Sequence, residues 1–175
     1  MTALEAYDLT TKGGGADFGR VIAICESIGP YCLIGGLAVN CYVEPVYTLD
    51  ADLVVISDVL SDVSQRLEQE GFVIQTFGNS KNARTPTSDL RVQFTTDERY
   101  QAFPARSEEH EVLAVYARVA CLEDVVQGKL WAYGDPQRRL SKRKKDELDL
   151  IRLAEVYPQV RTRYPKAILD QLAGL

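Results

Sequence analysis

The chain has 175 residues, of which 46% are hydrophobic and 26% charged, and its formal net charge is −5. This balance is typical of a soluble globular protein, and the acidic total gives no overall nucleic-acid signature. No apolar run approaches the roughly 20 residues of a membrane-spanning helix, and the polar N-terminus lacks the pattern of a secretion signal. We therefore expect a cytoplasmic protein without a membrane partner.

The N-terminal part is predicted to mix helices with short strands. The Gly-rich residues 1–15 are expected to form a loose tail, and residues 16–120 to form the core. Apolar spacing and breaker residues define its elements. The predicted helices cover 16–29, 37–44 and 57–71. The predicted strands cover 31–34, 49–56, 72–77, 89–96 and 111–120, with 78–88 as a polar loop and 97–110 irregular.

Residues 121–175 are predicted to be helical. One helix is expected over 122–133, and a second is expected to begin at Pro136, with Asp135 as its cap, and to end near 157. A last short helix should end near 172. No flexible linker separates this portion from the core, so we expect a single compact unit. The fold class is α/β (α+β): a small mixed sheet with helices packed on it.

Two carboxylates stand inside an apolar strand, in the sequence LDADLVVI. Successive strand side chains alternate between faces, so Asp50 and Asp52 share one face, about 6.6 Å apart along the strand. Buried charge of one sign is costly without a counter-charge. Paired carboxylate oxygens suit a hard divalent ion, Mg²⁺ or Mn²⁺. We therefore predict that Asp50 and Asp52 bind metal.

The glycine pair that precedes this strand adds a second indication. Gly35 and Gly36 follow one predicted strand and open a helix. Backbone N–H groups in such a position bind phosphate, and glycine permits close approach. Phosphate binding beside a metal site suggests phosphoryl or nucleotidyl transfer. A tight turn is the alternative for the glycines.

Together these segments resemble a known family. GGLAVN followed by TLDADLVV is similar to the polymerase-β-type nucleotidyltransferase superfamily. The run ARVACLEDVVQGKLWAY and the following RRLSKRKKDELDLIRLAE resemble, more narrowly, the AbiEii-like nucleotidyl transferases related to toxin–antitoxin pairs. In that subgroup a lysine-bearing helix precedes a basic helix containing Lys-Asp and a further Asp. The matching residues are Lys129, Lys145, Asp146 and Asp149.

The resemblance implies an enzyme that moves a nucleoside monophosphate from a nucleoside triphosphate to a hydroxyl, with release of pyrophosphate. The hydroxyl could belong to RNA such as tRNA, a protein or a small molecule, and an antitoxin could be a partner. The implied catalytic residues are Asp50, Asp52 and Lys129. The candidate nucleotide-binding residues are Gly35, Gly36, Arg91, Gln93 and Lys145. Arg91 could instead pair with Asp52, and Lys145 with Asp146.

One position departs from the superfamily. A third carboxylate usually lies on a neighbouring strand, and the candidate strand DLRVQFTT has Gln93 there. An amide offers a carbonyl ligand but no charge, and it cannot act as a base. A catalytically impaired nucleotide-binding or regulatory module is therefore the main alternative. A weaker alternative is an RNA-binding accessory protein that uses the basic run at 138–145. The same run could instead bind the polyphosphate of a substrate, or be a solvated face.

Overall fold

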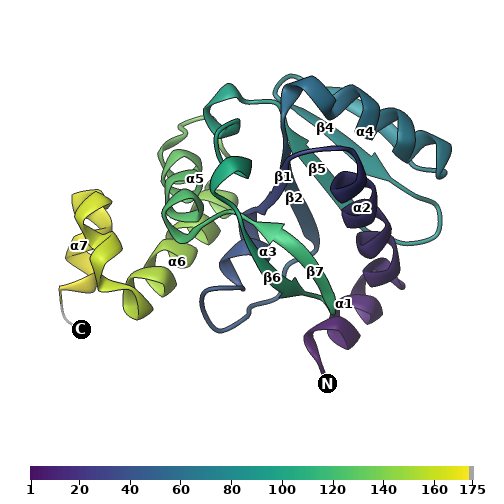
Figure 1. The fold of residues 1–175 in the computed structure, drawn as a ribbon. Helices are drawn as coiled ribbons and strands as arrows, with labels where there is room; N and C mark the ends of the chain where they lie inside the picture. The colour runs from purple at the N-terminus through teal and green to yellow at the C-terminus, as the bar shows by residue number, and fades with distance from the viewer. Residues whose placement is uncertain (174–175) are drawn as a thin grey trace.

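The structure, a computed structural model, describes residues 1–173, which form a mixed seven-stranded sheet flanked by helices (Figure 1). The strands are β1 (Tyr31–Ile34), β2 (Asp50–Val55), β3 (Val73–Phe77), β4 (Ser80–Arg84), β5 (Arg91–Thr95), β6 (Glu108–Val112) and β7 (Val115–Val119). The α-helices are α1 (Ala3–Thr11), α2 (Gly14–Ile28), α3 (Gly35–Val39), α4 (Ser57–Gln69), α5 (Leu122–Gly134), α6 (Leu140–Val156) and α7 (Lys166–Leu172). Short 3₁₀ turns are η1 (Glu98–Tyr100), η2 (Pro104–Arg106) and η3 (Pro158–Arg163).

The strand order is β3-β4-β5-β2-β1-β7-β6, so β2 lies at the centre. It pairs antiparallel with β1 and parallel with β5. Helices α2 and α4 lie on one side of the sheet, and α5 and α6 lie on the other (Figure 1). This arrangement confirms the predicted fold class. None of the helices within residues 1–173 is long and apolar enough to cross a membrane.

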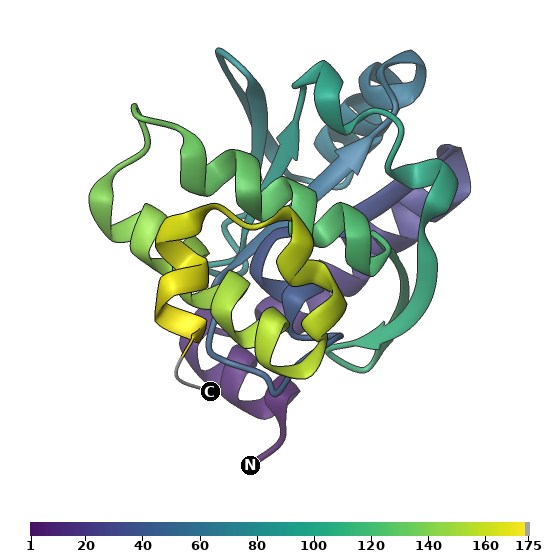
Figure 2. The same cartoon turned by 90° about the vertical axis from the view of Figure 1, so that its left-hand side faces the viewer.

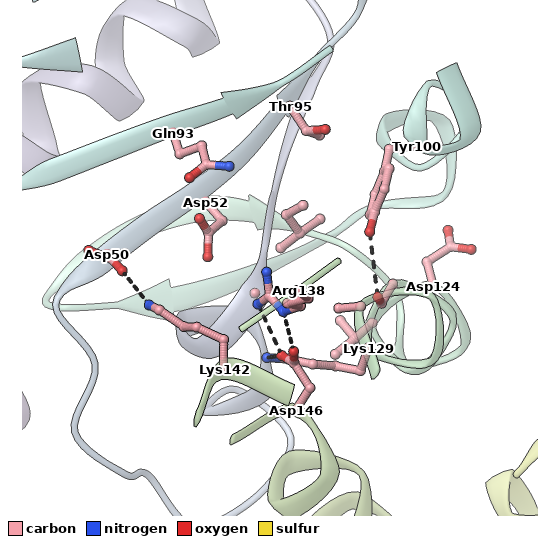
Figure 3. A pocket seen from close by; sticks show the side chains of 15 residues that line it. Asp50, Asp52, Gln93, Thr95, Tyr100, Asp124, Lys129, Arg138, Lys142 and Asp146 are labelled. Carbon is pink, nitrogen blue, oxygen red and sulfur yellow. Dashed lines mark hydrogen bonds and ion pairs between the residues drawn. The ribbon is translucent and has the colours of Figure 1, made fainter. Parts of the chain in front are cut away.

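Alternation along β2 decides which side chains face each layer. Ala51 and Leu53 are buried in the core that also contains Phe18 of α2 and Leu67 of α4. The intervening Asp50 and Asp52 point to the side of α5 and α6 (Figure 3). The predicted shared face of the two aspartates is therefore confirmed, because the inward residues fix the register of the strand.

The N-terminal segment differs from the prediction of a loose tail at 1–15. It forms helix α1, which starts with a capping box between Thr2 and Glu5. Tyr7 on this helix is buried, and its hydroxyl donates to the Leu49 carbonyl oxygen at 3.0 Å. The capping box, visible in the sequence as Thr2 and Glu5 three residues apart, stabilises the start of the helix. The Tyr7 hydrogen bond, a long-range contact that no local pattern predicts, holds the helix against the start of β2.

Two predicted irregular segments contain strands. The loop expected at 78–88 includes β4, a polar strand in which only Ala83 is buried. The strand expected at 111–120 is instead a hairpin of β6 and β7, which also takes in part of 97–110. Its turn residues Leu113 and Ala114 have φ of 52° and 62°. Turns of this kind usually contain glycine or asparagine. Neither residue is present at 113–114, so the sequence did not predict a turn there.

Two helix boundaries also differ from the predictions. The helix expected at 37–44 ends at Val39, because the Asn40 side chain bonds the Val46 backbone at 2.7 and 3.0 Å and turns the chain. Helix α6 begins at Leu140 rather than Pro136. The Asp135 side chain accepts from the Gln137 backbone N–H at 2.9 Å, so it stabilises a turn and does not cap α6.

Candidate active site

A cavity of about 240 Å³ lies between the centre of the sheet and helices α5 and α6 (Figure 3). Its floor is formed by β2 and β5, and its opposite wall comes from the C-terminal helices. The charged residues that line it are Asp50, Asp52, Asp124, Lys129, Arg138, Lys142 and Asp146. Ile34, Gly35, Gln93, Thr95 and Tyr100 are among its other lining residues. The cavity therefore joins both predicted parts of the chain.

The two strand aspartates have different surroundings. Asp50 is held by two cations: Arg91 Nε lies 3.1 Å from Oδ1, and Lys142 Nζ lies 3.5 Å from Oδ2. The Asp52 side chain makes neither a hydrogen bond nor an ion pair within residues 1–173, although its backbone is paired in the sheet. Burial raises its pKa, which the charge of Lys129 opposes and that of Asp50 reinforces. Asp52 is thus the carboxylate that most needs a counter-charge.

The two glycines contribute in different ways. Gly35 lines the cavity and has φ of +70°, and a Cβ added there would lie 2.2 Å from Asp52 Oδ2. Gly36 is buried, and its Cβ would lie 2.9 Å from Thr48 Oγ1. Both positions therefore require a residue without a side chain. Only Gly35 brings bare backbone to the cavity beside Asp52.

Lys129 is buried in an ion network between α5 and α6. Its Nζ lies 2.9 Å from Asp146 Oδ1 and 2.7 Å from Asp149 Oδ2. Burial lowers the pKa of Lys129, but Asp149 and Asp146 outweigh this effect and raise the pKa overall. Arg138 also pairs with Asp146, at 2.6 Å. Lys129 reaches the cavity wall, as Figure 3 shows, as a cation already neutralised by two carboxylates.

The remaining predicted site residues lie at varied distances from the cavity. Gln93 is the β5 register partner of Asp52 and lines the cavity, as expected for the position of a third carboxylate. Arg91 pairs with Asp50, not with Asp52. Lys145 donates to Thr48 Oγ1 at 3.4 Å, outside the lining. Its proposed pairing with Asp146 is not observed, because neighbours in a helix do not face each other.

Lys142 and Arg138 line the cavity but were not predicted individually as site residues. Both belong to the basic run at 138–145, for which the sequence left open a solvated face, RNA binding or contact with the polyphosphate of a substrate. The spacing of Lys142 and Asp146 could have indicated this: they are four residues apart, so they lie on one face of α6, the face that lines the cavity. Asp124, which lines the cavity and pairs with Arg106 at 2.8 Å, gave no comparable signal.

The residues of the cavity fit a divalent cation only in part. Among residues 1–173 no group of three His, Cys, Asp or Glu side chains is placed to hold a metal. Asp50 and Asp52 remain, with the Gln93 amide beside them. The unpartnered Asp52 and its raised pKa are what a bound cation would relieve. Two carboxylates and an amide oxygen form a ligand set for a hard ion.

The fold is similar to that of several solved nucleotidyltransferase structures. The sequence matches no protein-family model and no curated protein.

Three solved structures illustrate this similarity of fold. The solution structure of the antibiotic-resistance factor ANT(2'')-Ia superimposes with a TM-score of 0.58 and 14% identity, covering 91% of this chain and 96% of its own. The lincomycin-bound lincosamide antibiotic adenylyltransferase LnuA superimposes with a TM-score of 0.54 and 13% identity, and the match covers 81% of this chain and 96% of that protein. An antigenic nucleotidyltransferase-like protein from Paracoccidioides brasiliensis superimposes with a TM-score of 0.53 and 18% identity, and the match covers 81% of this chain and 75% of that protein. At such low sequence identity, these superpositions establish a shared fold and no more.

Proposed function

We propose that this protein is a metal-dependent nucleotidyltransferase that moves a nucleoside monophosphate from a nucleoside triphosphate to a hydroxyl acceptor. One observation carries the proposal: Asp50 and Asp52 face the same cavity, beside Gly35, in a fold shared with nucleotidyltransferases. Asp52 without a protein partner is costly in any structural role, and a metal-bound role explains it.

In this proposal each residue has a defined task. Asp50 and Asp52 would hold Mg²⁺ or Mn²⁺, which when bound neutralises charge on the phosphates. Gly35 gives the triphosphate room, and Lys142 and Arg138 supply positive charge at the opposite wall. The acceptor oxygen bonds to the α-phosphorus, the bond to the bridging oxygen breaks, and pyrophosphate leaves. The acceptor proton passes to water or to Asp52, since Gln93 cannot accept it.

The acceptor and the biological role are the finer parts of the proposal. A small-molecule acceptor is favoured by the neighbours, since one is described in complex with adenylyl-2''-tobramycin and another with lincomycin. A tRNA or protein acceptor, an antitoxin partner and membership of the AbiEii-like group rest on the sequence resemblance. The accessory RNA-binding alternative is weakened, because Arg138 and Lys142 of the basic run pair with Asp146 and Asp50.

A second candidate function rests on Gln93. It lies in register with Asp52, where an enzyme of this type is expected to have its third carboxylate. Without that charge the protein could bind nucleotide and metal but transfer nothing, as a regulatory module. The Gln93 side chain is exposed to the cavity and makes no hydrogen bond within residues 1–173, so it can be exchanged without disturbing the core.

One experiment separates the two candidates. The protein is incubated with labelled nucleoside triphosphates, Mg²⁺ or Mn²⁺, and a lysate containing RNA, proteins and small molecules. Asp52→Asn and Gln93→Glu are tested beside it, with the exposed Asp62→Asn as matched control. Transfer by the parent and control, lost in Asp52→Asn by about 100-fold or more, supports the enzyme.

Other outcomes decide against the enzyme. An inactive parent that binds nucleotide with metal, and becomes active as Gln93→Glu, supports the regulatory module. Failure of the parent to bind any nucleoside triphosphate in the presence of metal contradicts both candidates. Equal transfer by Asp52→Asn and the parent contradicts the assigned role of the carboxylate pair.

A further inference from the structure

The sheet has an open face that begins at the candidate active site. On β4 the buried Ala83 points into the core, so Asn82 and Arg84 point to the opposite face. Asn82 lies in register with Gln93, and Gln93 with Asp52. The same face therefore runs from β2 across β5 to β4. In Figure 2 the β3–β4 hairpin extends beyond the C-terminal helices that cover β2.

A second cavity, of about 210 Å³, lies on this face beside Asp50. Its cationic lining comes from Arg84, Arg91 and Lys142, which surround one carboxylate, Asp50. Arg91 and Lys142 pair with Asp50. Arg84 is exposed and has no ion pair within residues 1–173. The cavity consequently carries an excess of positive charge, although the chain as a whole is acidic.

Asn82 adds a specific requirement. Its Oδ1 is buried and has no hydrogen-bond partner within residues 1–173. A buried amide oxygen of this kind costs about 1–3 kcal/mol unless a donor reaches it. Since Asn82 also lines the cavity, rotation of its amide would turn this oxygen toward a ligand, whose hydroxyl group would supply the donor. The cavity is thus suited to a group with negative charge and an adjacent hydroxyl, which describes a phosphorylated sugar.

The second cavity lies where an acceptor, and not the nucleotide, is expected to bind. Gly35, where we place the triphosphate, follows β1 on one side of β2. Arg91 and Arg84 belong to β5 and β4 on the other side. Neighbouring strands are about 4.8 Å apart, so Arg84 lies about 10 Å from the line of β2, within reach of a substrate that spans both cavities.

We propose that this second cavity binds a phosphate group of the acceptor, whose hydroxyl then lies near Asp52. The inference rests on the proposed transferase function and names its acceptor class: a phosphorylated sugar, free or at the end of an RNA strand. A polycationic acceptor would be repelled by the arginines. Arg84 is the specificity residue, because it has no other partner.

The test measures binding without metal or triphosphate, so it does not depend on catalysis. The probes are ribose 5-phosphate, unphosphorylated ribose, and a short single-stranded oligoribonucleotide, titrated by calorimetry against the parent protein. Arg84→Gln is the test variant. Lys81→Gln is the matched control, since Lys81 lies on the same strand with its side chain on the opposite face. Thermal unfolding confirms that both variants are folded.

The expected result is that a phosphorylated probe binds the parent and Lys81→Gln alike, and binds Arg84→Gln about tenfold or more weakly. Binding of ribose 5-phosphate assigns a small phosphorylated acceptor, and binding of the oligoribonucleotide alone assigns an RNA end. The inference is overturned if ribose binds as well as ribose 5-phosphate, if Arg84→Gln is without effect, or if neither phosphorylated probe binds.

A parallel titration separates this inference from the proposed function. Binding of a metal–nucleoside triphosphate complex should be equal in the parent and Arg84→Gln. An equal loss of nucleotide and phosphate binding would assign the cavity to the triphosphate and overturn the inference. Phosphate binding that depends on Arg84, in a protein without transferase activity, would establish the phosphate site but contradict the proposed function, and the bound ligand would then not be an acceptor.

Discussion

At the scale of single residues, Asp52 shows most clearly that the site is arranged for a ligand. It lies among cations that are all engaged elsewhere: Lys129 with Asp146, and Lys142 with Asp50. Its pKa is raised, chiefly by burial. A raised carboxylate pKa means that ionising Asp52 costs stability in the folded protein. The residue is therefore destabilising at neutral pH.

We predict that Asp52→Asn stabilises the protein at pH 7 while it abolishes metal binding. The gain comes from removing the charge of a partly buried carboxylate, because Asn occupies the same place without ionising. Protonation of Asp52 stabilises the folded parent protein. This stabilisation is fully present below the ordinary pKa of an aspartate, and it is lost as the pH rises through the raised pKa of Asp52. The difference between variant and parent should therefore vanish at low pH.

Denaturant unfolding across a pH series measures this difference. Asp50→Asn is the matched control, because it loses the pairs with Arg91 and Lys142 and should not gain stability. An Asp52→Asn variant that is less stable than the parent at pH 7 would show that Asp52 has a structural role.

At the scale of elements, the sequence predicted those segments whose local pattern matched their burial. Strand β2 was identified because its inward residues alternate with Asp50 and Asp52, and the glycine pair correctly marked the end of β1. Strand β4 and helix α1 were missed. In β4 only Ala83 is buried, and α1 is held by long-range contacts such as Tyr7 with Leu49. Such contacts depend on tertiary structure that no local pattern encodes.

The cavity wall shows the same limit. The carboxylates on β2 could be predicted because both lie on one strand. The partners of Lys129 could not, because they come from a separate helix that brings Asp146 and Asp149 to it. Lys129 resembles a catalytic lysine in sequence, yet its contacts are those of a residue that joins two helices.

We predict that Lys129→Met destabilises the protein by about 1–3 kcal/mol, because Asp146 and Asp149 lose their common buried cation and keep only Arg138 and Arg152. Lys144→Met on the neighbouring helix α6 should change stability less, because Lys144 itself is exposed and the buried Glu147 keeps its hydrogen bond from Gln171. Urea unfolding of both variants measures the contrast. Loss of activity in Lys129→Met without loss of stability would instead support a catalytic lysine.

At the scale of the whole molecule, the core and the helical portion meet at the proposed metal site. Lys142 of α6 reaches Asp50 of β2, and Lys145 of the same helix reaches Thr48. In this arrangement the C-terminal helices already supply the counter-charge that a metal would provide. A bound cation therefore has to compete with Lys142 and Arg91 for Asp50.

This competition gives opposite expectations for metal alone and for metal with nucleotide. We predict that Lys142→Gln binds Mn²⁺ a few-fold more tightly than the parent, because an exposed ion pair of up to about 1 kcal/mol no longer competes. The same variant should bind Mn²⁺ with a nucleoside triphosphate more weakly, because Lys142 lines the cavity and would face the phosphates once displaced.

Calorimetric titration with each ligand measures both effects, and Lys144→Gln on the same helix is the matched control. If both affinities fall together, Lys142 maintains the shape of the site and does not compete for Asp50. If they change in opposite directions, the movement of Lys142 from carboxylate to phosphate couples the helical portion to substrate binding.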